Sequence, residues 1–217
     1  MDYSSFIAQT DHHKIIPVFY HRDPEVAIAV VKASYDGGVR IFEFVNRGAN
    51  GLDVFKSVVD AFKDHKDLVL GVGTIFDSQT ASSFIEAGAA FVVSPGLVGE
   101  LANFCTENNV AYIPGVGTIT EAMRAKHLGC RMIKIFPANV IGSAFAKAVK
   151  SVMPELTIMP TGGIEPTVDS MKQWFDAGVS CVGMGSQLFD KKKIAQNDFQ
   201  ALQADIFDAV SKARQLA

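Results

Sequence analysis

Two charged residues stand inside short apolar segments, and they are the first candidates for chemistry. Glu43 belongs to the segment Val39–Val45, and Lys134 belongs to the segment Met132–Phe136. An unpaired charge is costly to bury. Burial and nearby groups can lower the pKa of a lysine from about 10.4 towards neutrality, and a neutral amine is the nucleophile of Schiff-base chemistry. The pair therefore indicates an active site, with a buried structural salt bridge as the alternative.

Further polar and glycine residues follow other apolar segments. Arg47 comes four residues after Glu43, and its guanidinium could hold a carboxylate through two parallel hydrogen bonds. As an alternative, it is a solvated loop residue. Glycine-bearing loops, Pro160–Gly163 and Gly183–Ser186, stand at the ends of the last two apolar segments. In eight-stranded α/β barrels, the loops after strands seven and eight often bind phosphate. These features predict a site for a small anionic substrate, although many glycine pairs are only turns.

Eight apolar segments must position these residues. Each is short, nearly continuous and rich in Val, Ile and Phe, which is typical of parallel strands buried on both faces. Between them, apolar residues recur at intervals of three and four, as in amphipathic helices. The expected strands are Ile15–Tyr20, Val39–Val45, Leu68–Val72, Phe91–Ser94, Ala111–Pro114, Met132–Phe136, Leu156–Met159 and Ser180–Gly183, and the expected helices include Pro24–Tyr35, Leu52–His65, Ser78–Ala87, Thr120–Leu128 and Asp198–Leu216.

Eight strand–helix repeats without a break in composition predict an α/β fold, a (β/α)8 TIM barrel, in one domain over residues 1–217. The first dozen residues are expected to add an N-terminal helix. A doubly wound open sheet is the competing architecture. In a barrel, strands two and six lie opposite each other, so Glu43 and Lys134 could meet across the axis near the C-terminal mouth.

Composition excludes several classes of protein. The net charge is −3, and no basic run exceeds Lys191–Lys193, so the broad basic surface of a nucleic-acid-binding protein is missing. We expect that lysine run to be an exposed loop. No apolar stretch approaches the roughly 20 residues that cross a bilayer. The segment before the first strand also lacks the pattern of a signal peptide. These features favour a cytoplasmic protein with no nucleic-acid or membrane partner.

The metal-binding residue types are scattered along the sequence. Cys105, Cys130 and Cys181 are odd in number and widely spaced, which favours reduced thiols over a zinc site or disulfides. Cys181 lies in an apolar run, where we expect it to be buried. His21 alone among the histidines comes soon after an expected strand, and no carboxylate–histidine cluster accompanies it. We therefore expect neither a metal nor a cofactor.

Seven short motifs, spread over nearly the whole chain, resemble those of the family of 2-keto-3-deoxy-6-phosphogluconate (KDPG) and 4-hydroxy-2-oxoglutarate (KHG) aldolases. Each motif alone is a weak signal, and their order and spacing together are specific. The motifs are Gly37-Gly38-Val39-Arg40 leading to Glu43, Gly71-Val72-Gly73-Thr74, Val93-Ser94-Pro95-Gly96, Ile113-Pro114-Gly115-Val116, Lys134-Ile135-Phe136-Pro137-Ala138, Pro160-Thr161-Gly162-Gly163-Ile164 and Gly185-Ser186.

The resemblance implies a role for each matching residue. Lys134 is similar to the Schiff-base lysine, and Glu43 to the general acid/base that acts through water. The resemblance also implies a homotrimer. The remaining matches are Arg47 and Thr161 for the carboxylate of the keto acid, Thr74 and Phe136 for the pocket wall, and Gly162, Gly163 and Ser186 for the phosphate.

The implied activity is a class I aldolase that reversibly cleaves KDPG to pyruvate and glyceraldehyde 3-phosphate. KHG, cleaved to pyruvate and glyoxylate, is a further expected substrate. The alternatives are an aldolase for the 6-phosphogalactonate epimer, a non-catalytic phosphosugar-binding barrel, and a metal-dependent epimerase or decarboxylase. Two departures from the family pattern leave the substrate open: Val45-Asn46 replaces a frequent Thr-Leu, and Gly142-Ser143 replaces a frequent Gly-Gly.

Overall fold

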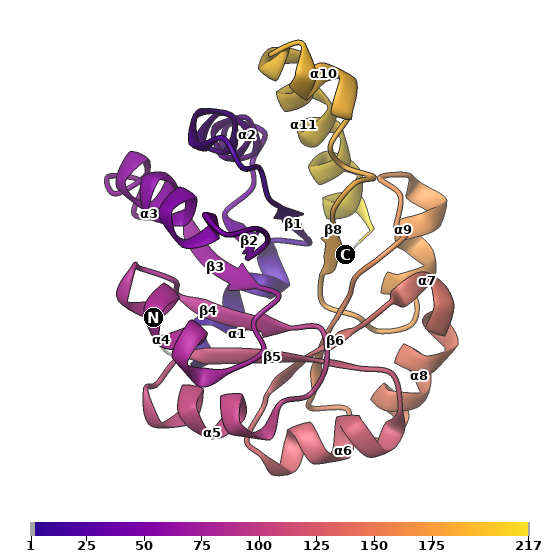
Figure 1. Cartoon of the computed structure of the whole chain (residues 1–217). Coiled ribbons are helices and arrows are strands. Elements are labelled where there is room, and N and C mark those ends of the chain that lie inside the picture. The colour runs from indigo at the N-terminus through magenta and orange to yellow at the C-terminus, as the bar shows by residue number, and fades with distance from the viewer. Residues whose placement is uncertain (1–2, 217) are drawn as a thin grey trace.

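In the computed structural model, which describes residues 3–216, eight parallel strands alternate with helices along the chain (Figure 1). Every strand lies within two residues of its expected bounds at each end. The strands are β1 (Ile15–Phe19), β2 (Ile41–Val45), β3 (Val69–Gly73), β4 (Phe91–Ser94), β5 (Ala111–Val116), β6 (Met132–Ile135), β7 (Thr157–Pro160) and β8 (Val182–Met184).

The helices follow the strands and cover the outside of the sheet (Figure 1). One expected helix is too long: α3 ends at Ala61 rather than at His65, because the chain turns there and the N–H of His65 donates to the carbonyl of Phe62 at 2.9 Å. The helices are α1 (Tyr3–His12), α2 (Pro24–Asp36), α3 (Gly51–Ala61), α4 (Ser78–Glu86), α5 (Gly99–Glu107), α6 (Ile119–His127), α7 (Ala138–Ile141), α8 (Ser143–Val152), α9 (Val168–Phe175), α10 (Lys191–Ala195) and α11 (Phe199–Gln215).

The sheet closes into a barrel. Its strand order is β7-β6-β5-β4-β3-β2-β1-β8, so each strand from β1 to β6 pairs with the next in sequence and β8 returns to β1. A parallel bridge between Thr161 and Gly183 joins the end of β7 to β8 and completes the ring. The predicted (β/α)8 barrel is therefore confirmed, and the open doubly wound sheet is excluded.

Side chains of the strands alternate between two apolar clusters. On β2, Ile41 belongs to the cluster inside the barrel, whereas Phe42 and Phe44 belong to the cluster between strands and helices. On β6, Met132 faces inward and Ile133 faces outward in the same way. Because successive side chains point to opposite faces of a strand, Glu43 and Lys134 are turned into the barrel.

Helix α1 closes the N-terminal end of the barrel, as expected for an extra N-terminal helix. Phe6 is fully buried in the interior cluster, with its ring centroid 4.8 Å from that of Phe91. The Tyr3 hydroxyl donates to the carbonyl of Tyr112 at 2.6 Å and accepts hydrogen bonds from the backbone N–H groups of Arg131 and Met132, each at 3.1 Å. Burial raises the pKa of the Tyr3 phenol well above its usual value.

The expectation that Lys191–Lys193 forms a loop is wrong. These residues open α10, because lysine is a good helix former and the Asp190 carboxylate accepts from the N–H of Lys192 at 2.7 Å as an N-cap. Lys193 also pairs with Asp205 on α11 at 2.5 Å. Within residues 3–216, no helix is both long and apolar enough to cross a membrane.

Truncation of Phe6 should test the closure by α1. Replacing Phe6 by Ala should lower the free energy of unfolding by about 3–5 kcal/mol, because the change leaves a cavity in the closed barrel. The matched control is Phe207→Ala, since Phe207 is 60% exposed and its loss should cost less than about 0.5 kcal/mol. Urea unfolding of both variants measures the difference, and equal stabilities would show that α1 does not seal the barrel.

Candidate active site

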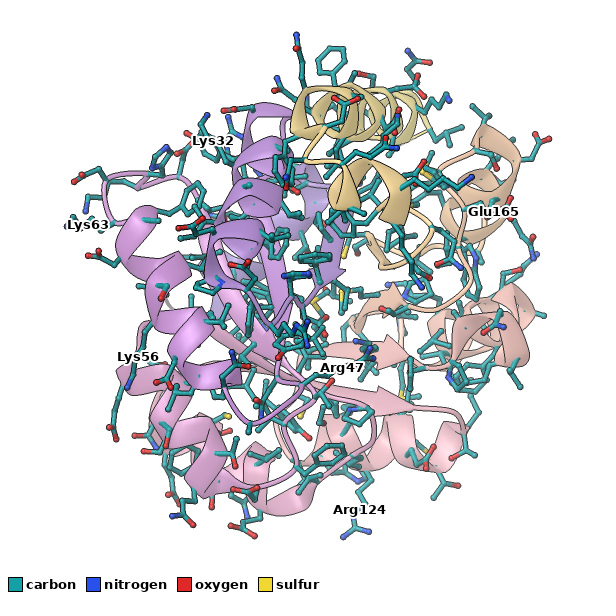
Figure 2. The ribbon with its side chains drawn as sticks, turned by 45° about the horizontal axis from the view of Figure 1, so that its top comes forward. Lys32, Arg47, Lys56, Lys63, Arg124 and Glu165 are labelled. Atoms are coloured by element: carbon teal, nitrogen blue, oxygen red, sulfur yellow. The ribbon has the colours of Figure 1, made fainter. Side chains whose placement is uncertain are left out.

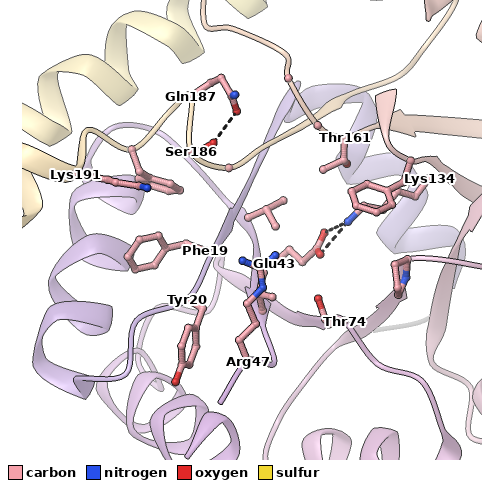
Figure 3. A pocket seen from close by; sticks show the side chains of 18 of the residues that line it. Phe19, Tyr20, Glu43, Arg47, Thr74, Lys134, Thr161, Ser186, Gln187 and Lys191 are labelled. Atoms are coloured by element: carbon pink, nitrogen blue, oxygen red, sulfur yellow. Dashed lines mark hydrogen bonds and ion pairs between the residues drawn. The ribbon is translucent and has the colours of Figure 1, made fainter. Parts of the chain in front are cut away.

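A cavity of about 430 Å³ opens at the C-terminal end of the barrel (Figure 3). Its wall comes from the ends of β1, β2 and β6 and from the loops after β3, β4, β7 and β8. This is the end at which barrel enzymes carry their active sites. All nine residues proposed from the sequence line the cavity: Glu43, Arg47, Thr74, Lys134, Phe136, Thr161, Gly162, Gly163 and Ser186.

Glu43 and Lys134 meet across the barrel at the floor of the cavity (Figure 3). The Nζ atom of Lys134 lies 3.1 Å from Oε1 and 3.3 Å from Oε2 of Glu43. The Lys134 side chain is 7% exposed and the Glu43 side chain is 1% exposed, so both charges are almost completely removed from water. The Phe136 ring covers the same amine, with its centroid 5.6 Å from Nζ. A nucleophile and a potential base are thus in hydrogen-bond contact at the end of an open cavity.

Glycines in neighbouring strands leave space for two polar side chains of the site, those of Glu43 and Thr161. A Cβ atom at Gly73 would lie 2.0 Å from Oε1 of Glu43, and one at Gly183 would lie 2.1 Å from Oγ1 of Thr161. Real Cβ atoms do not approach other atoms so closely, so any larger residue at Gly73 would displace the carboxylate. The sequence showed Gly73 only as part of a motif, because its role depends on the register between β2 and β3.

Thr161 carries a buried hydroxyl without a hydrogen-bond partner within residues 3–216. Its Oγ1 atom has no hydrogen-bond partner among the residues described, and the side chain lines the cavity. Buried polar groups are nearly always satisfied, so an unpaired hydroxyl at a cavity wall indicates a ligand that completes it. Its backbone is fixed on both sides: the N–H donates to the carbonyl of Ile135 at 2.9 Å, and the carbonyl accepts from Ala138 at 2.8 Å.

Two loops at the cavity have unusual backbone conformations. Thr74, just after β3, has a φ of 64°. This is rare for a β-branched residue, and such strain clusters at functional sites. After β7, Gly162 and Gly163 have φ values of 110° and 72°. Within residues 3–216 their backbone N–H groups make no hydrogen bond, and both residues line the cavity, so these donors are available to an anion there.

The charges that line the cavity favour an anion. Arg47, Lys134 and Lys191 oppose the single carboxylate of Glu43, so three positive groups and one negative group leave two positive charges when all are ionised. Arg47 projects over the strand ends near the centre of the molecule, whereas Lys32 and Lys63 lie at its edge (Figure 2). Arg47 makes no ion pair with any residue that the structure describes. The cavity therefore suits a small anionic substrate.

Sequence reasoning missed Lys191 and Gln187, which also line the cavity. A lysine run alone does not indicate where the Lys191 side chain points, because its direction is set by the position of α10 in the fold. His21 lies outside the cavity lining and bonds to the backbone of Asp23, with the Asp23 N–H 3.1 Å from Nδ1. Among residues 3–216, no group of three or more His, Cys, Asp or Glu side chains is placed to hold a metal.

The cysteines lie away from this chemistry. All three are free and buried, which confirms the expectation for Cys181. Burial raises the pKa of the Cys105 and Cys130 thiols to about 12. Since the thiolate is the reactive form, these groups are inert at neutral pH.

Comparison with known proteins gives consistent matches over most of the chain. A family model described as KDPG and KHG aldolase matches residues 7–204. The 2-dehydro-3-deoxy-phosphogluconate aldolase of Pseudoalteromonas atlantica is 31% identical over 189 residues, covering 87% of this chain and 86% of the relative. The KHG/KDPG aldolase of Escherichia coli K12 is 30% identical over 202 residues, covering 92% of each.

A solved structure has the same architecture. The KDPG aldolase of Legionella pneumophila, captured with pyruvate as a covalent carbinolamine intermediate, superposes with a TM-score of 0.84. The two chains are 26% identical, and the match covers 93% of this chain and 96% of the other. The same fold is therefore shared along nearly the whole of both chains.

Double substitution of the buried pair should separate function from stability. Glu43→Leu should lower the free energy of unfolding by about 3–5 kcal/mol, because it leaves the Lys134 amine buried without its partner. Adding Lys134→Met should restore at least wild-type stability, since apolar residues of similar volume replace buried ion pairs without loss. Urea unfolding of the three proteins tests this. A double variant that stays less stable than wild type would show that the pair is kept for stability.

Proposed function

The chain belongs to the KDPG and KHG aldolase family, and from this membership we propose that it cleaves KDPG to pyruvate and glyceraldehyde 3-phosphate through a Schiff base on Lys134. That it is a carbon–carbon lyase follows from the family. The observation that carries the mechanism is the buried contact between Lys134 and Glu43 at 3.1 Å. It places an amine nucleophile beside a carboxylate that can accept a proton from it.

The reaction starts at the carbonyl carbon of the keto acid. The Glu43 carboxylate takes a proton from the Lys134 ammonium, and the free amine adds to C2 to form a carbinolamine. Glu43 returns this proton to the carbinolamine hydroxyl, which leaves as water and gives a cationic imine. The Glu43 carboxylate, now free of its proton, then accepts the proton of the C4 hydroxyl through a water molecule. The C3–C4 bond breaks, its electron pair moves into the imine as an enamine, and C4 becomes the aldehyde. Such proton transfer contributes about 10²–10⁴-fold to the rate.

The enamine then takes a proton at C3 and becomes the imine of pyruvate. Addition of water to this imine releases pyruvate and returns Lys134 as an amine. Burial of the amine beneath Phe136 supports this sequence, because a site with little water keeps the imine from hydrolysis before the carbon–carbon bond breaks.

The carboxylate and the phosphate, at the two ends of the substrate, would bind to different hydrogen-bond donors in the cavity. Arg47 and the unpartnered hydroxyl of Thr161 would hold the carboxylate beside C2, the first by charge and the second by a hydrogen bond. The free backbone N–H groups of Gly162 and Gly163, with the Ser186 hydroxyl, would receive the phosphate. Thr74 and Phe136 complete the wall.

The same mechanism extends to KHG, and the E. coli relative is named for both substrates. We also propose that residues 1–217 form one catalytic domain and that the protein acts as a homotrimer in the cytoplasm, as the resemblance and the composition suggest. A relative named as an aldolase for the 6-phosphogalactonate epimer is 29% identical, so the choice between C4 epimers requires a direct assay.

Trapping with borohydride tests the Schiff base. Wild-type protein incubated with pyruvate and borohydride should gain a reduced adduct on Lys134, located by peptide mass spectrometry, because borohydride reduces the imine. Lys134→Met should show no adduct, whereas Lys192→Met, on the exposed side of α10, should be labelled like wild type. Rates with KDPG, its C4 epimer and KHG then identify the substrate. Labelling elsewhere, or none in the folded protein, would refute the role of Lys134 and favour the phosphosugar-binding barrel.

Displacement of the carboxylate by a neighbouring methyl group tests Glu43 without changing it. Gly73→Ala should lower kcat by about 10²-fold, because the new Cβ would occupy the place of Oε1 and move the base from its partner. The matched control is Gly96→Ala, where a Cβ meets nothing within 4 Å. Steady-state kinetics on both folded variants measures the effect, and unchanged kcat in Gly73→Ala would remove Glu43 from the proton transfer.

A further inference from the structure

Lys191 extends towards the cavity from the wall opposite Lys134. It is the first residue of α10, and its ammonium lies on the side that carries Ser186 and Gln187 (Figure 3). Of the three consecutive lysines, only Lys191 lines the cavity. Lys193 forms an ion pair with Asp205, with 2.5 Å between Nζ and Oδ2. Lys191 makes no ion pair with any residue in the described part of the chain. The ammonium of Lys191 is therefore free to bind a ligand.

The loop beneath Lys191 is held from both sides. Phe189 is 3% exposed, and its ring packs against Phe19, with centroids 4.9 Å apart. On the other side, Asp190 caps the N–H of Lys192 at 2.7 Å. A residue between a buried anchor and a helix cap has a fixed Cα position, so the reach of its side chain is restricted to one region. Lys191 consequently presents its charge to the cavity in the absence of substrate.

The charge of Lys191 complements one end of the proposed substrate. When C2 is attached to Lys134, the carboxylate is on the next carbon, and the phosphate on C6 is four carbons away in the other direction. Arg47, after β2, serves the first anion. At the other side of the cavity Ser186 bonds to Gln187, with 3.1 Å between Oγ and Oε1, and both are uncharged. Lys191 is thus the cation available to a dianion at that side.

We propose that Lys191 is a specificity-determining residue that binds the terminal phosphate and selects phosphorylated substrates over their unphosphorylated counterparts. This inference rests on the proposed function. A lysine ammonium binds phosphate as a compact charge with up to three donors. Because Lys191 is exposed, salt screens part of the attraction, so its effect should be moderate and should fall as ionic strength rises.

The test compares two substrates that differ only at C6, namely KDPG and 2-keto-3-deoxygluconate, which carries a hydroxyl there. Lys191→Met should lower kcat/KM for KDPG by about tenfold, mainly through KM, because it removes binding that ground state and transition state share. Its kcat/KM for 2-keto-3-deoxygluconate should not change. Lys191→Arg should keep most of the preference, and Lys192→Met is the matched control for charge. The KM of wild type for KDPG should rise with salt more steeply than that of Lys191→Met.

The outcomes separate this inference from the proposed function. Equal kcat/KM values for KDPG in wild type and Lys191→Met would overturn the role of Lys191, while cleavage and the pyruvate adduct on Lys134 would leave the aldolase intact. An equal loss on both substrates would also overturn it, because a structural effect does not distinguish phosphate from hydroxyl. If wild type cleaves neither substrate and forms no adduct, the proposed function fails and the inference fails with it.

Discussion

The Glu43–Lys134 ion pair is the interaction on which the site depends. Removing two ions from water costs several kcal/mol each, and their mutual attraction offsets this only in good geometry. The barrel supplies that geometry by projecting the two side chains from strands β2 and β6 on opposite sides of its axis. Gly73 next to the pair leaves space that a methyl group would fill. The surrounding packing therefore holds an ion pair whose burial is unfavourable, and the pair serves catalysis once a substrate binds.

The interior of the barrel is divided along its axis between stability and chemistry. The N-terminal half is apolar and sealed by Phe6 from α1. The C-terminal half carries the polar groups, namely the ion pair, the Thr161 hydroxyl and the glycine loop. This division lets the packed half hold the strands in register, while the open half keeps groups unpaired until a ligand binds. In the sealed half, which no ligand can enter, an unpaired buried hydroxyl like that of Thr161 would only destabilise the fold.

Much of this arrangement could be predicted from the sequence, for reasons that are local. Charges inside the apolar segments of β2 and β6 indicated Glu43 and Lys134, because strand alternation fixes the face of each side chain. The features that were missed depend on long-range packing. The role of Gly73 needs the register with β2, and the direction of Lys191 needs the placement of α10. The positive φ of Thr74 has no sequence signal, since threonine rarely adopts it.

The contacts of Tyr3 also bear on how the chain reaches this structure during synthesis. Its hydroxyl bonds to the backbone of Arg131 and Met132, so α1 docks against a strand that is made much later than the helix itself. At the usual rates of translation, about 5–20 residues per second, the apolar face with Phe6 waits on the order of ten seconds for its partners. During synthesis the apolar face of α1 is therefore without its packing partners until the ring of strands can close.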